Sequence, residues 1–177
     1  MEKNHIAYFP RGLFGDRGES LVRRVESDLS ALHEGPLFGK AAEPPLRVYR
    51  FTWIRAFHPA IVVCLAFGPY LPARLSIKKL TRDHMFPAFP STDRVEKEVS
   101  DDEVEAIVQT FRSSGFREAP CSDQKQGVSL DGAMWIIEAV EPDFYHAIYR
   151  HSPSSGPARI VGEAFLNLAG LTGEEIY

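Results

Sequence analysis

The polar side chains most able to carry out chemistry lie in one stretch, residues 127–152. This stretch reads GVSLDGAMWIIEAVEPDFYHAIYRHS, and pairing its two halves as strands places four polar or aromatic residues on one face: Asp131, Trp135, His146 and Arg150. Arg150 could bind an anion there while Asp131 or His146 moves a proton, which would make a small enzyme site for an anionic substrate. The alternative is structural: Arg150 stacks on Trp135, and Asp131 neutralises the guanidinium. We favour the structural interpretation and assign no catalytic residue.

Glu138 lies in the middle of the same stretch, between Ile137 and Ala139. A carboxylate at such a position must have a partner or face solvent. Arg50 and Arg55, from an earlier apolar run, are the candidate partners. A pair of this kind specifies the packing of a sheet more often than it catalyses a reaction.

Familiar catalytic and ligand-binding motifs do not occur in the sequence. There is no HExxH or GxSxG, and the glycines at positions 12, 15 and 18 have neither a preceding strand nor a following lysine and serine. His146 and His151 are five residues apart on one expected strand, so they point to opposite faces and cannot chelate one ion. We therefore expect no metal and no cofactor.

The central stretch has the pattern of an antiparallel hairpin. Runs rich in β-branched and aromatic residues flank Glu141-Pro142-Asp143-Phe144, a composition typical of a tight turn. The expected register places four pairs opposite each other: Val140 and Tyr145, Glu138 and Ala147, Ile136 and Tyr149, Trp135 and Arg150. Both faces are apolar at their centres, which indicates a sheet that is covered at least in part on each side.

This hairpin and the segment after it resemble a known family. The segments LDGAMWIIEAV and YHAIYRHSP, followed by a helix ending in LNLAGL, are similar to those of a family of small intracellular bacterial proteins without an established activity. The resemblance covers residues 130–171, with RFTWIRAFHP (residues 50–59) as weaker support. It implies a bacterial origin and a shared fold, and it marks six motif positions: Asp131, Trp135, Glu138, Tyr145, Arg150 and Ser152.

Composition indicates one ordinary globular domain spanning residues 1–177. The chain is 44% hydrophobic and 25% charged, and its net charge of −4 argues against a nucleic-acid surface. The two cysteines form no disulfide framework, and we expect Cys64 to be a buried apolar side chain. The longest apolar run, residues 60–67, is too short to span a membrane, and the N-terminus lacks the apolar core of a secretory signal. We expect a cytoplasmic protein.

Hydrophobic periodicity predicts the remaining elements. Helices are expected at residues 19–33, after the capping box Ser100-Asp101-Asp102-Glu103, and after Gly156-Pro157. Strands are expected at residues 46–57, 60–67 and 74–82. The fold class is therefore α+β: an antiparallel sheet built from two hairpins plus an additional strand, with helices packed on it.

Two loops carry apolar side chains that could bind a partner. Residues 1–18 read as an irregular arm, and residues 83–99 read as a long connector that is either a functional loop or an unrecognised element. The candidate partner-binding residues are Tyr8, Phe9 and Phe14 in the arm and Met85, Phe86 and Phe89 in the connector. That these residues fold back onto the core is an equally good interpretation.

These observations favour a non-catalytic protein-binding module, for example an immunity or antitoxin-like inhibitor of a bacterial toxin. The acidic balance would favour a basic partner. The alternatives are a ligand-binding or regulatory domain, and a small enzyme that acts on an anionic substrate through Asp131, His146 and Arg150. The sequence leaves the oligomeric state open.

Overall fold

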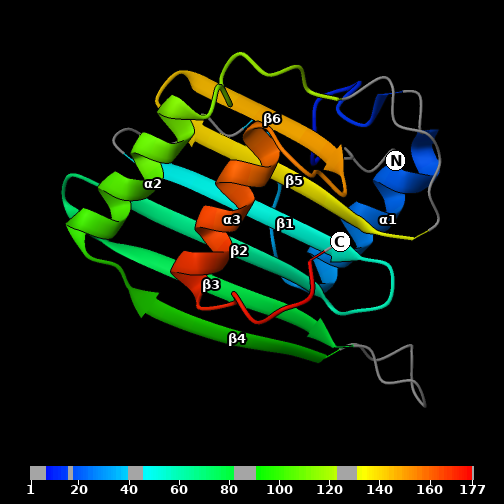
Figure 1. Ribbon diagram of the computed structural model, residues 1–177, viewed down its shortest axis with the longest axis horizontal. Helices are drawn as coiled ribbons and strands as arrows, with labels where there is room; N and C mark the ends of the chain where they lie inside the picture. The colour runs from blue at the N-terminus through cyan, green and yellow to red at the C-terminus, as the bar shows by residue number, and fades with distance from the viewer. Residues whose placement is uncertain (1–6, 16–17, 40–45, 82–90, 123–130, 177) are drawn as a thin grey trace, which may run out of the picture.

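The computed structural model describes residues 7–15, 18–39, 46–81, 91–122 and 131–176. Its centre is a single antiparallel sheet with helices on both faces, so the expected α+β class is confirmed (Figure 1). The strands are β1 (Arg47–Arg55), β2 (Ala60–Gly68), β3 (Leu71–Thr81), β4 (Ser91–Glu98), β5 (Ala133–Glu141) and β6 (Phe144–His151). Their order in space is β4-β3-β2-β1-β5-β6, which is one strand more than the sequence predicted.

The β5–β6 hairpin forms with the predicted register. Trp135 lies opposite Arg150, and Glu138 lies opposite Ala147. Asp143 adopts a left-handed backbone conformation at the turn, with φ of 58°, which aspartate tolerates better than most residues. The β5–β6 hairpin joins the β1–β2 hairpin because β5 pairs with β1, which makes β1 a central strand.

The prediction that residues 83–99 form a connector is wrong for its second half, because residues 91–98 form the edge strand β4. Its sequence, STDRVEKE, contains a single apolar residue. Edge strands with solvent on both faces need no hydrophobic alternation, so the usual signal of a strand is missing here. Residues 82–90 lie outside the described residues.

In the described part of the chain, three helices cover the sheet. Helices α2 (Asp101–Ser113) and α3 (Pro157–Ala169) lie on one face, and α1 (Gly18–Ala31) lies on the other (Figure 1). The predicted capping box at the start of α2 is present: the Ser100 hydroxyl accepts from the Glu103 amide, and the Glu103 carboxylate accepts from the Ser100 amide. Gly170 ends α3 in the left-handed conformation, with φ of 73°.

Each face of the sheet has its own apolar core. Ile136 is buried in the core on the α1 side, and the core on the α2–α3 side includes Trp53, Ile61, Val63, Leu65, Ile107, Val108, Phe111 and Ile148. Helix α3 approaches the sheet at Gly162, where an added Cβ would lie 2.2 Å from Cζ3 of Trp135. Only glycine permits this approach, so the position of α3 depends on it.

No helix in the described part of the chain is long and apolar enough to cross a membrane.

Candidate functional site

The fold brings several charged side chains together inside the molecule, on the α1 side of the sheet. Arg50 on β1 faces Glu138 on β5, and its Nε and Nη2 atoms lie 2.7 and 2.6 Å from the same carboxylate oxygen, Oε2. Both side chains are completely buried. The partnership of Glu138 with Arg50 was one of the two predicted from the sequence, and it is confirmed.

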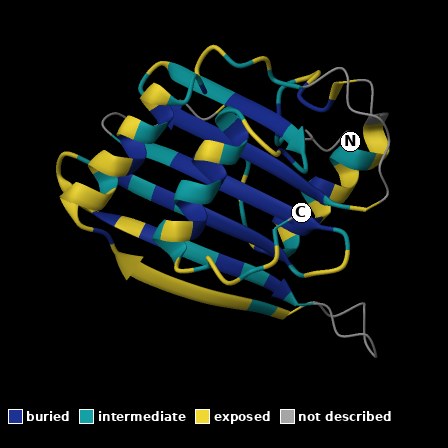
Figure 2. Ribbon diagram, in the orientation of Figure 1, coloured by how far each residue is buried: buried dark blue, intermediate teal, exposed yellow. Residues whose placement is uncertain are grey.

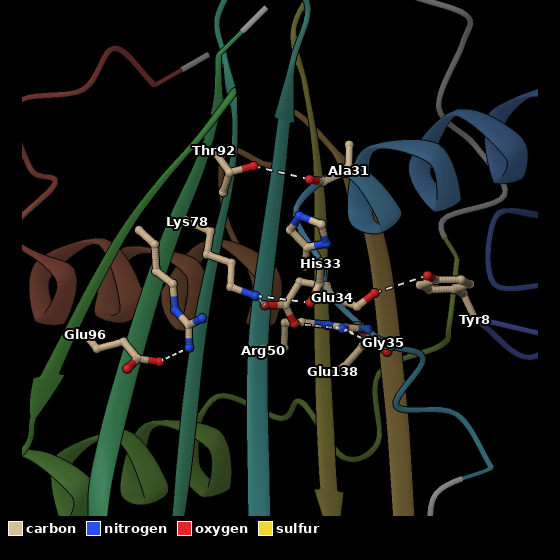
Figure 3. A network of polar contacts seen from close by, with 11 residues as sticks. Tyr8, Ala31, His33, Glu34, Gly35, Arg50, Lys78, Thr92, Glu96 and Glu138 are labelled. Atoms are coloured by element: carbon tan, nitrogen blue, oxygen red, sulfur yellow. Dashed lines mark hydrogen bonds and ion pairs between the residues drawn. The ribbon is translucent and has the colours of Figure 1, made fainter. Parts of the chain in front are cut away.

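A second carboxylate extends this ion pair toward β3. Glu34 lies 3.4 Å from Nη1 of Arg50 and 2.6 Å from Nζ of Lys78, so it bridges two cations (Figure 3). On the other side, the Tyr145 hydroxyl donates a 3.0 Å hydrogen bond to Glu138. We call this group of five side chains the buried ion network. It carries two positive and two negative formal charges, so these charges compensate one another.

The network attaches the end of α1 to the sheet. Arg50 donates a 2.8 Å hydrogen bond to the carbonyl of Gly35, and Lys78 donates to the carbonyl of His33 at 3.3 Å (Figure 3). His33 has a positive φ of 54°, which turns the chain after α1 so that these carbonyls point at the sheet. Sequence spacing could not reveal this group, because its members come from five separate segments.

Burial and ion pairing have opposite effects on the pKa values of Arg50 and Glu138. Burial raises the pKa of the Glu138 carboxyl, against the opposing effect of the Arg50 guanidinium. Burial would lower the pKa of Arg50, but its surroundings together, Glu138 foremost with Glu34, outweigh burial and the pKa is raised. Burial also raises the pKa of the Cys64 thiol, opposite Arg50 on β2, to about 12. Cys64 is therefore a protonated, unreactive side chain, as the sequence suggested.

A substrate cannot reach Arg50 or Glu138, since neither has exposed surface. What the buried ion network can do is fix the register of β1, β5 and the end of α1. Misplacing any of these segments would leave a buried charge without its partner.

Trp135 and Arg150 lie opposite each other on the β5–β6 hairpin, but their contacts go to different partners. Trp135 is buried against Phe51 and Trp53, and the cation placed over its ring is Arg159 of α3, at 5.5 Å. Arg150 donates instead to the carbonyls of Pro120 and Cys121. The sequence could not identify Arg159, because only the packing of α3 on the sheet brings it to Trp135.

His146 and Arg150 both contact the segment before the hairpin. Nε2 of His146 lies 3.0 Å from the Ala119 carbonyl oxygen, and burial lowers the pKa of its imidazole. The Tyr149 amide also donates to the carbonyl of Cys121, so this segment runs along the outer edge of β6. Asp131 lies at the surface, at the start of the hairpin. The hairpin face thus secures a neighbouring segment through backbone carbonyls.

The aromatic residues of the N-terminal arm face inward. Phe9 and Phe14 are buried, and their rings meet edge to face at 5.4 Å. Tyr8 is half-buried and donates to the carbonyl of Glu34, next to the buried ion network. Of the two interpretations that the sequence left open, this arrangement favours residues folded back onto the core. Met85, Phe86 and Phe89 lie outside the described residues.

A different apolar feature is exposed, at the turn between β2 and β3. Tyr70 is 87% exposed and Leu71 is 63% exposed. Leu71 lines a hollow of about 320 Å³ whose rim includes Glu98 and Asp101, at the start of α2. We call the two turn residues the apolar tip. Sequence reasoning missed it because Tyr70 and Leu71 follow a Gly68-Pro69 turn signal and looked like ordinary loop residues.

The part of the chain that the structure describes contains no group of three His, Cys, Asp or Glu side chains that could hold a metal ion. No model of a known protein family matches the chain, and no curated protein matches it either. The resemblance of residues 130–171 to a bacterial family thus stays a prediction.

Proposed function

We propose that the protein is a non-catalytic binding module that inhibits a basic protein partner by occlusion, in the manner of an immunity or antitoxin protein that blocks a bacterial toxin. The observation that carries this proposal is the apolar tip: exposed Leu71 lines a hollow beside the acidic start of α2, and the exposed Tyr70 directly precedes it. The exposed residues of this region lie at one end of the sheet (Figure 2).

The chemistry of the apolar tip suits a protein anchor. Interfaces concentrate their binding energy in a few aromatic or arginine residues, and tyrosine supplies a large contact area at a low entropic cost. Tyr70 lies in the turn between two long paired strands, and Leu71 begins the second strand opposite Gly68, so the apolar tip is held in place before a partner arrives.

Charge around the apolar tip determines the kind of partner. The first turn of α2 carries Asp101 and Asp102, both exposed, and Glu98 precedes it on β4. Together with the net charge of −4, these carboxylates would attract a basic surface and raise the rate of association at low salt. An acidic inhibitor of this kind matches a toxin that itself binds an anionic target such as a nucleic acid.

The test is co-expression with the products of neighbouring genes, which are the natural candidates for a toxin. The expected result is that one basic product arrests growth alone, is harmless with this protein, and co-purifies with it as a stable complex. The double variant Tyr70→Ala/Leu71→Ala should weaken that complex by about 30-fold or more, since two anchors are removed. Its thermal midpoint should stay close to that of the parent, because both side chains are exposed.

Phe57→Ala is the matched control, because Phe57 is 76% exposed at the turn between β1 and β2, at the other end of the sheet. This variant should bind the partner as the parent does. The proposal is wrong if the double variant binds normally. It is also wrong if Asp131→Asn alone abolishes protection, since occlusion depends on no single titratable group.

Ligand binding is the second candidate function, and a specific hollow favours it. A space of about 560 Å³ lies between α1 and the turn joining β1 to β2, with Arg24 and His58 among its lining residues. These side chains would suit a small anionic molecule. A rise of the thermal midpoint with such a molecule, lost in Arg24→Ala, would support this function instead.

A further inference from the structure

Strand β4 leaves one edge of the sheet open. Within the described residues it pairs with β3 alone, and it lies at one edge of the sheet in Figure 1. Nearly all of its residues are exposed, as the yellow strand in Figure 2 shows. Backbone amides and carbonyls at such an edge can pair with another strand, so a natural protein either blocks the edge or uses it.

The charges of β4 are arranged about its one apolar residue. Val95 stands at the centre and is 57% exposed. Two residues before it is Asp93 and two after it is Lys97, while Arg94 and Glu96 flank it directly. The two positions on each side of Val95 therefore carry the opposite charge to their mirror positions on the other side.

We propose that two copies of this chain associate through β4, antiparallel, about a two-fold axis that passes between the two Val95 residues. In this register Asp93 lies opposite Lys97 of the second copy, and Arg94 lies opposite Glu96 of the second copy. Symmetry repeats both pairs, so the interface contains four attractive charge pairs around a central valine pair. The two sheets become one continuous sheet.

The two faces of β4 support this arrangement. Thr92 donates to the Ala31 carbonyl of α1, while Lys97 donates to the Leu168 carbonyl of α3, so alternate residues point to opposite faces. Arg94 and Glu96 accordingly share the α1 side and already bind each other within the strand. Residues that oppose each other in an antiparallel pair lie on the same face. Asp93 can therefore meet Lys97 of the second copy, and Arg94 can meet Glu96 of the second copy, without rearrangement of the strand.

Neighbouring registers are unfavourable. A shift of the axis by half a residue would set side chains of opposite faces against each other, for example Asp93 against Glu96, and an antiparallel pair does not allow this. A full-residue shift toward Arg94 sets Arg94 against Arg94, and a full-residue shift toward Glu96 sets Glu96 against Glu96 and keeps only the attraction of Arg94 to Glu98, so both have fewer attractive pairs. Parallel pairing in register sets every charge against its own copy. Like charges directly opposite each other destabilise a strand pair, so the charges select the register centred on Val95.

A charge swap tests the pairing. Sedimentation equilibrium of the full chain should show a concentration-dependent dimer. Arg94→Glu should weaken dimerisation by about tenfold or more, because it turns two attractive pairs into two repulsive ones. The double variant Arg94→Glu/Glu96→Arg should restore it, since the exchanged charges are again complementary. Arg23→Glu on α1 is the control: it makes the same change of charge at an exposed position away from β4, and dimerisation should be unaffected.

A cysteine at the axis tests the register. Val95 is the residue that meets its own copy, so Val95→Cys in a Cys121→Ser background should form an intermolecular disulfide under mild oxidation. Opposed residues in an antiparallel pair have the Cα separation that a disulfide requires. Asp93→Cys in the same background lies off the axis and should crosslink far less.

A chain that stays monomeric at every accessible concentration would overturn the proposal. A dimer that Arg94→Glu leaves unchanged, or one that crosslinks equally through Asp93→Cys, would overturn it as well. A monomer whose β4 instead pairs with a strand of a different protein would assign the edge to that protein. None of these outcomes depends on Tyr70 or Leu71. The proposed inhibitory function is therefore tested independently of the dimer.

Discussion

Arg50 and Glu138 show how single residues specify this fold. Taking either charge out of water costs several kcal/mol, and the ion pair with its surrounding hydrogen bonds offsets this cost only in the native geometry. Such a pair does not need to make the protein more stable than an apolar pair would. Its effect is to make the wrong registers of β1 and β5 much less stable than the right one.

Replacing Arg50 with methionine should therefore be strongly destabilising. Arg50→Met leaves Glu138 buried without its cation, and the free energy of unfolding should fall by about 3–5 kcal/mol. Urea unfolding at neutral pH measures this. The double variant Arg50→Met/Glu138→Leu should recover most of the loss, because it leaves no buried charge without a partner. A loss below about 1 kcal/mol for the single variant would show that Glu138 finds another partner or a proton.

At the scale of elements, polar contacts help to attach the segment that follows α3 to the sheet. Glu174, after α3, lies 2.6 Å from Nη1 of Arg55 and 3.1 Å from Nζ of Lys79. Arg55 is itself stacked over Trp53 at 4.4 Å. The segment that follows α3 is thus held by charges on β1 and β3, in addition to the packing of Leu171 and Ile176 against the core.

Acid should release this segment. The hydrogen bond from Arg55 lowers the pKa of Glu174 below its ordinary value of 4.5. A carboxyl with a lowered pKa in the folded state stabilises the protein above pH 4.5, and this contribution is lost as the pH falls through the folded-state pKa. Unfolding measured from about pH 7 down to about pH 3 should show a smaller acid-dependent loss for Glu174→Gln than for the parent.

Glu175→Gln removes the same charge from the adjacent residue without removing a partner of Arg55 or Lys79. It should retain the acid-dependent loss of the parent. Equal acid profiles for the parent and Glu174→Gln would show that other carboxyls are responsible for the loss.

At the scale of the whole molecule, the sheet separates two apolar cores. The larger core joins α2 and α3 to the sheet. Phe111 of α2 contacts Tyr49 of the sheet, Phe116 after the helix and Phe165 of α3, with ring centroids 4.2, 4.8 and 6.1 Å away. Because it is buried among all three, it connects both helices to the sheet.

Phe111→Ala should lower the free energy of unfolding by about 3–5 kcal/mol, since it removes a buried ring and leaves a cavity between aromatic neighbours. Denaturant unfolding followed by tryptophan fluorescence measures the change. Ile160→Ala on α3 is a useful control, because Ile160 is 47% exposed and should cost far less. A loss below about 1 kcal/mol for Phe111→Ala would make α2 peripheral to the fold.

Local signals in the sequence were enough for most elements. The capping box at Ser100, the glycine after α3 and the turn at Pro142-Asp143 each act on their own neighbours, so their meaning does not depend on the rest of the chain. Alternation in the two hairpins likewise determined the α+β class and the β5–β6 register. Even the partner of Glu138 could be narrowed to two arginines, because a carboxylate in mid-strand needs a cation.

Contacts between distant segments were decided only by the tertiary structure. Edge strand β4 has no hydrophobic alternation to reveal it, since neither of its faces is buried. Glu34 and Lys78 join Arg50 only after α1 packs against the sheet, and Arg159 reaches Trp135 only after α3 docks at Gly162. The packing of distant segments also decides that Phe9 and Phe14 are buried and that Tyr70 is exposed. A side chain's hydrophobicity shows that it prefers an apolar environment, but the packing of the whole chain decides which side chains obtain one.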